Sequence, residues 1–173
     1  MKLLVAIAPE RYRDEELDEP LAEFRANSVV FDIASTRTGT CSGMLGGKMA
    51  ATLSFDNIDP SGYDGIMIIG GGGSKSHLWG DRNLAGLVTT FHSQKKIIAA
   101  ICLSPVVLAR AGVLRGMKAT VFNSPDAIAE MKKEGAVLTG LPVVEDGMVI
   151  TADGPGASRA FGKAVISALA GKK

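Results

Sequence analysis

A short apolar run that ends in a cysteine and leads directly into a helix is the feature that most constrains the fold. Residues 97–101, IIAAI, are apolar without alternation, which is typical of a strand buried on both faces of a parallel sheet. Cys102 follows at the carboxyl end of that strand. Ser104 is the expected N-cap and Pro105 the first helical residue, since the missing N–H of proline costs little there. The pattern predicts a nucleophile elbow, a strand-to-helix turn that exposes a reactive side chain above an α/β sheet.

This placement of Cys102 leaves two interpretations open. A thiol beside the positive end of a helix ionises more easily, which favours a nucleophile. The alternative is a structural cysteine, because free cysteines are among the most buried residue types.

Apolar runs alternate with helical patterns along the whole chain, which is the signature of an α/β fold with a mainly parallel sheet. Strands are expected at residues 3–8, 29–34, 48–55, 65–69, 97–101 and 118–122, and a turn-rich excursion at 39–47. Helices are expected at 14–25, 84–93, 125–133 and 157–170, besides the one that follows the elbow. Residues 143–145 and 148–152 are expected to pair as a hairpin across Asp146 and Gly147. The sequence shows neither repeat nor linker, so we expect a single domain over residues 1–173.

The composition excludes several classes of protein. Nineteen basic and eighteen acidic side chains leave a net charge of +1, without a basic cluster for nucleic acid. Apolar runs fall far short of the roughly 20 residues that a membrane-spanning helix needs, and the segment after Lys2 is too brief for a signal peptide. We therefore expect a cytoplasmic protein, in which Cys41 and Cys102 stay unbridged. Two histidines and the lack of CxxC or HxxxH spacing argue against a metal, and we expect no cofactor.

Two further features are expected at the same edge of the sheet as Cys102. The run Gly70–Gly73 follows a buried strand, so its N–H groups are free to hold a phosphate or an oxyanion, or the glycines merely allow a tight turn. The run fits neither the P-loop nor the GxGxxG pattern. Glu16 lies in the first turn of a helix that also begins at this edge. It either points inward or stays solvated and complements the helix dipole.

Together these segments resemble the ThiJ/PfpI superfamily of flavodoxin-like, glutaminase-related proteins over nearly the whole chain. AAICLSP at 99–105 resembles the AxICxGP elbow of the family, and IIGGGG at 68–73 resembles its LPGG turn. Glu16, four residues before Pro20, occupies the place of the family's buried acid, and GPGAS at 154–158 is similar to the GPGTS of its deglycase branch. ARAGVLRGMKAT at 109–120 resembles the segment after the elbow helix. The resemblance implies a three-layer sandwich with helices on both faces of the sheet.

The resemblance also implies a site and an assembly. Cys102 would be the reactive cysteine, with a protonated Glu16 hydrogen-bonded to its sulfur and the N–H groups of Gly72 and Leu103 forming an oxyanion hole. The pocket candidates around them are Gly71, Gly73, His77 and Phe122. A homodimer or larger homo-oligomer is implied as well. Two positions depart from the family, because Leu103 and Phe122 stand where different branches carry a histidine.

The departure at Leu103 orders three functional hypotheses. Peptide hydrolysis needs a proton for the departing amine, which leucine cannot supply, whereas a thiol adds to an aldehyde without expelling an amine. The first hypothesis is therefore a cysteine-dependent enzyme of glyoxalase or deglycase type that acts on small reactive carbonyls, with Cys102 as nucleophile and Glu16 as acid and base. The second is an intracellular cysteine peptidase or amidase. The third is a non-catalytic sensor of oxidative stress that works through oxidation of Cys102.

Overall fold

A mainly parallel sheet forms the centre of the molecule. The computed structural model describes residues 1–171, and within them seven strands join in the order β11-β12-β8-β7-β1-β3-β6. Neighbouring strands are parallel except the β11–β12 hairpin. The strands are β1 (Lys2–Ala6), β3 (Val30–Ser35), β6 (Leu53–Ser54), β7 (Gly65–Ile68), β8 (Ile97–Ile101), β11 (Val143–Asp146) and β12 (Val149–Ala152).

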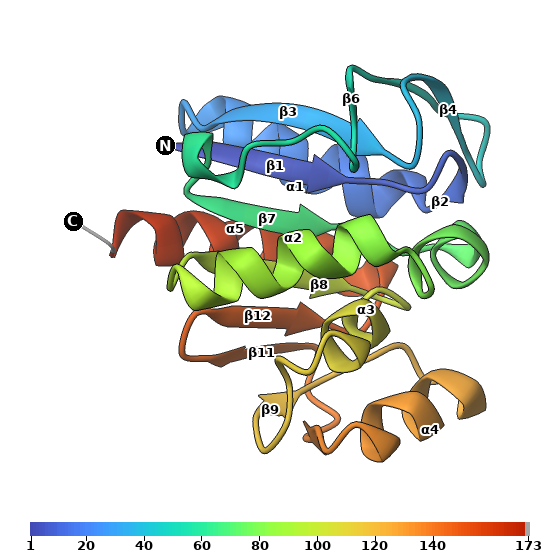
Figure 1. Ribbon diagram of the computed structural model, residues 1–173, viewed down its shortest axis with the longest axis vertical. Helices are drawn as coiled ribbons and strands as arrows, with labels where there is room; N and C mark the ends of the chain where they lie inside the picture. Colours follow the sequence, from blue (N-terminus) through green and yellow to red (C-terminus); the bar gives the residue numbers. More distant parts are fainter. Residues whose placement is uncertain (172–173) are drawn as a thin grey trace.

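Helices cover both faces of this sheet (Figure 1). One face packs against α2 (Arg82–Ser93) and α3 (Pro105–Arg110), and the other against α1 (Asp14–Ala26) and α5 (Ser158–Ala170). The helix α4 (Pro125–Lys133) packs against α3. Three short helical turns, η1 (Pro60–Gly62), η2 (Ser74–Leu78) and η3 (Pro155–Ala157), lie in loops of the described part of the chain. This arrangement confirms the predicted three-layer α/β fold.

The alternation of side chains along each strand explains why two separate cores form. In β1, Leu4 and Ala6 join the core under α2 and α3, whereas Leu3 and Val5 join the core under α1 and α5. Because both faces of a parallel sheet are covered, the strands read as continuous apolar runs. This is the physical reason that the runs at β1, β7 and β8 were visible in the sequence.

A small sheet beside the main one differs from the sequence expectation. β2 (Glu10–Tyr12), β4 (Gly39–Gly43) and β5 (Lys48–Ala51) form it, and we call it the arm. The strand expected over 48–55 splits between the arm and β6, since β5 pairs with β4 and β6 with β3. Asp14 fixes the β4–β5 turn, because its carboxylate accepts the N–H groups of Leu45 and Gly47, both at 2.8 Å.

Two other segments also differ from expectation. The strand expected over 118–122 shortens to β9 (Lys118–Ala119), which pairs with β10 (Val137–Leu138). The hairpin turn is displaced by one residue: Asp146 pairs with Val149, so the turn is made by Gly147 and Met148. Gly147 begins this turn with a φ of +60°, a conformation that glycine adopts readily.

Among residues 1–171, no helix is long and apolar enough to cross a membrane.

Candidate functional site

Cys102 lies at the turn between β8 and α3 with a φ of +64°, in the left-handed region that non-glycine residues rarely adopt. Two backbone hydrogen bonds hold it there: its N–H donates to Ala152 O at 2.9 Å, and its carbonyl accepts the Phe122 N–H at 2.8 Å. Strain of this kind persists only where the surrounding structure imposes it, and it concentrates at functional sites.

Ser104 anchors the elbow in a way that the sequence did not predict. It occupies the N-cap position of α3 but makes no capping hydrogen bond. Its hydroxyl is buried between Ile69 O at 2.7 Å and Ser74 Oγ at 2.8 Å. The side chain therefore ties the elbow to the neighbouring glycine turn. The predicted N-cap position of Ser104 is confirmed, but its hydroxyl does not cap the helix.

The glycine turn lies directly against the elbow. A Cβ on Gly70 would lie 2.5 Å from Cys102 Cβ and 2.6 Å from Glu16 Oε2, so only glycine lets these two residues approach one another. Gly71 has a φ of +98°, and its N–H approaches the Cys102 sulfur together with the N–H of Leu103. Besides forming a turn, the glycines thus let Cys102 and Glu16 lie close together and direct a backbone N–H group toward the sulfur.

Glu16 points inward from the first turn of α1 and is fully buried. Its Oε2 accepts the Gly70 N–H at 2.9 Å, and the carboxyl group is hydrogen-bonded to the Cys102 thiol. Its Oε1 is buried without a hydrogen-bond partner among residues 1–171. Burial raises the pKa of Glu16 to about 7, although the two hydrogen bonds and the charge of Arg13 act in the opposite direction.

The Cys102 thiol is harder to ionise than an ordinary cysteine, not easier. Burial, followed by the charge of Glu16, raises its pKa to about 12, although the N–H groups of Gly71 and Leu103 favour the thiolate. The sequence prediction of an easily ionised thiol was wrong, because Cys102 is 5% exposed and lies beside the Glu16 carboxyl group, and both raise the pKa of the thiol. The site therefore pairs a neutral thiol with a carboxyl group that changes protonation near neutral pH.

A pocket of about 210 Å³ opens above the sulfur. It is lined by Arg13, Met44, Gly71, Gly72, Cys102, Leu103, Phe122 and Pro155. Five candidates from the sequence thus share one pocket, with Glu16 hydrogen-bonded to Cys102. Gly73 and His77 do not line it. Gly73 packs against the Glu10 carbonyl, where a Cβ would lie 1.8 Å from the oxygen, and His77 is half-buried in η2.

Three residues of the pocket wall were missed by sequence reasoning. Met44, from the turn of the arm, accepts the Gly72 N–H on Sδ at 3.4 Å. Arg13 is held by Glu15 through two hydrogen bonds of 2.8 and 3.0 Å. Pro155 could have been found, because it lies in the GPGAS segment that resembles the family motif. Arg13 lies only three residues before Glu16. Nothing in the sequence pointed to Met44.

Metal-ligating side chains do not gather within residues 1–171. No group of three or more His, Cys, Asp or Glu residues there could hold a metal ion.

Comparison with known proteins places this site in a family. The chain is 49% identical over 168 residues to an uncharacterized protein of Methanocaldococcus jannaschii, covering 97% of this chain and 82% of that one. It is 31% identical to a deglycase of Pyrococcus horikoshii over 85% of this chain and 86% of the relative. The crystal structure of a ThiJ/PfpI domain protein from Brachyspira murdochii has a TM-score of 0.94 and 29% identity, covering 98% and 96% of the two chains. The sequence model of the DJ-1/PfpI family matches residues 1–168, and the chain belongs to that family.

Proposed function

We propose that this protein is a cysteine-dependent enzyme of deglycase or glyoxalase type that acts on small reactive carbonyl compounds. The observation that carries the proposal is the buried hydrogen-bonded pair of Cys102 and Glu16 at a pocket of about 210 Å³. A cavity of this size is smaller than the roughly 300–1,000 Å³ of sites for drug-sized ligands and suits a molecule of a few heavy atoms. The relatives named deglycases support the same class of activity.

The protonation of the pair sets the first chemical step. Because the thiol is neutral at rest, the Glu16 carboxylate takes its proton as Cys102 Sγ attacks the carbonyl carbon. The proton then passes to the carbonyl oxygen, which gives a hemithioacetal without a leaving group. A carboxyl group with a pKa of about 7 suits this exchange, since a general base works best when its pKa lies near the working pH.

The negative charge that develops on the carbonyl oxygen needs donors. We propose that the N–H groups of Gly72 and Leu103 supply them, as both residues line the pocket. The Gly72 N–H points at Met44 Sδ, so the methionine side chain must move aside when a carbonyl oxygen takes its place. Met44 is 39% exposed, which leaves room for that movement.

The peptidase or amidase hypothesis has weaker support. The eight residues that line the described pocket include no histidine, so the proton for a departing amine would have to come from Glu16. Leu103 and Phe122 occupy two walls where a histidine would serve.

The sensor hypothesis has one favourable observation. The solved structure of oxidized Toxoplasma gondii DJ-1 is 25% identical to this chain, with a TM-score of 0.84. The N–H groups beside Cys102 would stabilise an oxidised sulfur formed with peroxide as the oxidant. Its high thiol pKa opposes rapid oxidation, because the thiolate is the species that reacts.

Proteins of the DJ-1/PfpI family are often oligomeric. We propose a homodimer or larger homo-oligomer in the cytoplasm as the working form, with neither nucleic acid nor membrane as a partner.

Product formation from methylglyoxal and glyoxal tests these alternatives, with Cys102→Ser as the control variant. We expect wild-type protein to form many equivalents of lactate or glycolate and Cys102→Ser to form none. A chromogenic amide in parallel tests the amidase hypothesis. Cleavage that depends on Cys102, without turnover of the aldehydes, would favour the amidase over the enzyme that acts on carbonyl compounds. If neither substrate is turned over and peroxide oxidises Cys102 stoichiometrically, the sensor is correct.

A further inference from the structure

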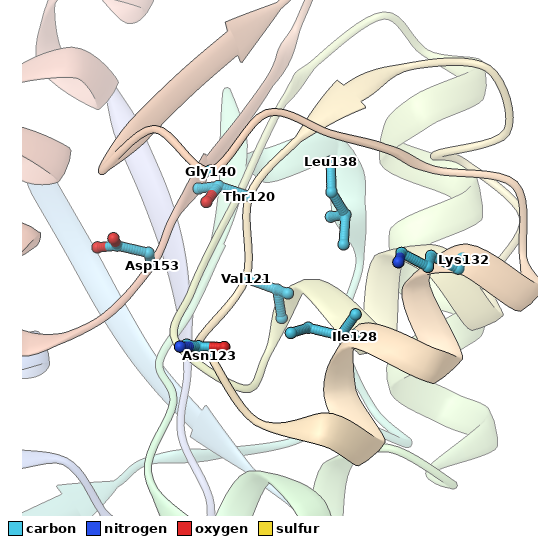
Figure 2. Close-up of a pocket in the computed structure, with 8 residues that line it drawn as sticks. All are labelled: Thr120, Val121, Asn123, Ile128, Lys132, Leu138, Gly140 and Asp153. Atoms are coloured by element: carbon cyan, nitrogen blue, oxygen red, sulfur yellow. The ribbon is translucent and has the colours of Figure 1, made fainter.

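A second and larger cavity lies beside the Cys102 pocket. Its volume is about 540 Å³, against about 210 Å³ for the pocket above the cysteine. The wall is built by α4, by the irregular segment 120–123, by residues 138 and 140 and by Asp153, which directly follows β12 (Figure 2). The volume lies within the range of roughly 300–1,000 Å³ that is typical of sites for small organic molecules.

Charged and apolar side chains are separated within this cavity. Figure 2 shows Asp153 and Asn123 at one side and Lys132 at the opposite side. The apolar side chains of Val121, Ile128 and Leu138 lie between them. The cavity thus presents a negative end, an apolar middle and a positive end.

The charged groups at the two ends have no partner in the structure. Among residues 1–171, the Asp153 carboxylate has no ion pair and accepts no hydrogen bond from another residue, and burial raises its pKa. Both acidic residues of α4 form ion pairs with other side chains, Asp126 with Lys75 and Glu130 with Arg110. The Lys132 ammonium therefore has no carboxylate partner within the described residues.

An unpaired and partly desolvated carboxylate gains most from a ligand that brings a positive donor. Hydrogen bonds between charged groups stabilise a complex more than neutral ones do. The Asn123 side chain makes no hydrogen bond among residues 1–171 and adds an amide oxygen at the same end. Lys132, at the other end, suits a carboxylate.

From this complementarity we propose that the cavity is a second ligand site for a small molecule with a protonated amine and a carboxylate at opposite ends of an apolar body, as in a short apolar peptide. The amine lies against Asp153 and Asn123, and the carboxylate against Lys132. The apolar body packs on Val121, Ile128 and Leu138.

The site is separate from the Cys102 pocket although the two share walls. Val121 and Asn123 line the second cavity, whereas Phe122 between them lines the Cys102 pocket. In the other shared wall, Asp153 faces the second cavity and Pro155 the Cys102 pocket. Binding in the second cavity therefore does not require the thiol.

Calorimetric titration with leucyl-leucine tests the proposal. We expect saturable binding that persists in Cys102→Ser and weakens about tenfold or more in Asp153→Asn, the change expected when a charged hydrogen bond is lost. Lys132→Gln should weaken it about threefold or more, since this charge is exposed to solvent. The matched controls Asp56→Asn and Lys133→Gln, at exposed positions outside the cavity, should leave binding unchanged.

Two modified peptides test the same contacts on wild-type protein, so the test does not depend on a variant that folds. N-acetyl-leucyl-leucine lacks the amine and leucyl-leucinamide lacks the carboxylate, and both should bind more weakly than the parent peptide. NMR shifts of the Val121, Ile128 and Leu138 methyl groups should report the bound state. Absence of binding by wild-type protein, equal binding of the N-acetyl peptide, or loss of binding in Cys102→Ser would overturn the proposal.

Discussion

Cys41 and Cys102 are both buried in the core under α1 and α5, with exposures of 0% and 5%, yet their local geometry differs. Cys41 lies within β4 of the arm, where it pairs with Met49 of β5, and its sulfur contacts Gly39 O at 3.9 Å. Cys102 has a strained backbone, a pocket above it and a buried carboxyl group beside it.

The difference shows that burial by itself does not define the environment of a cysteine. Regular strand geometry leaves Cys41 facing a packed core. The left-handed turn at Cys102 instead presents the side chain to a pocket above the sheet, and the sheet edge brings Glu16 and the glycine turn to it. Reactivity is therefore expected to follow the elbow and its neighbours.

The largest expected effect is the loss of turnover in Glu16→Gln. If Glu16 exchanges the proton of the thiol, turnover of methylglyoxal should fall by about 10² to 10⁴, the contribution of a positioned acid or base. Wild-type turnover should also fall as the pH drops through about 7, because the base becomes protonated there. The variant should lack this limb of the pH profile.

Glu19→Gln is the matched control for this substitution, since Glu19 lies on the same helix but is exposed. It should retain the turnover and the pH profile of the wild type. Undiminished turnover in Glu16→Gln would show that Glu16 is not the acid and base of the reaction. The buried carboxyl group would then not explain a functional difference between Cys102 and Cys41.

The second prediction compares the two thiols directly. With limiting iodoacetamide at about pH 8, Cys102 should be alkylated about tenfold faster than Cys41 or more, because its thiol opens into a pocket and that of Cys41 is fully covered. Peptide mass mapping over time measures both rates in one sample. Faster alkylation of Cys41 would contradict the proposal that Cys102, at the elbow, is the more reactive of the two thiols.

The strands of the central sheet could be predicted because each one is marked by a short run of neighbouring apolar residues. The strands at Lys2–Ala6, Gly65–Ile68 and Ile97–Ile101 are covered on both faces, so each reads as an uninterrupted apolar run. Since the carboxyl ends of parallel strands meet at one edge, the glycine run and Cys102 could be placed together without coordinates.

Features that depend on contacts between distant segments were not predictable. Met44 reaches the pocket because Asp14 fixes the turn of the arm, a contact that spans more than thirty residues. The direction of the Cys102 pKa depends on how deeply the elbow is buried, which a residue pattern does not report. Likewise, the Ser104 hydroxyl donates to the carbonyl of the distant Ile69 and makes no hydrogen bond to an N–H group of its own helix.

The third prediction concerns the sign of the coupling between Glu16 and Cys102. A protonated Glu16, as the family resemblance implied, would donate to the sulfur, and its removal would raise the thiol pKa. In the structure, the carboxyl group titrates near 7 and its charge raises the pKa of Cys102. Glu16→Gln should therefore lower the thiol pKa, and alkylation of Cys102 at about pH 8 should become several-fold faster. A slower reaction would indicate that Glu16 acts on the thiolate as a donor.

The smallest expected effect is at Met44, which lines the Cys102 pocket and accepts the Gly72 N–H on its sulfur. Met44→Ala should free this N–H and widen the pocket, so kcat/KM should rise about two- to fivefold for phenylglyoxal and less for methylglyoxal, a gain of about 1 kcal/mol or less. Met44→Leu removes the sulfur but keeps most of the volume, so it separates the hydrogen bond from the steric effect. Leu45→Ala is the control, since Leu45 is 62% exposed on the same turn and does not line the pocket. Equal kinetics in Met44→Ala and wild type for both aldehydes would mean that the methionine moves aside freely, and that access to Cys102 is set by the elbow and the glycine turn alone.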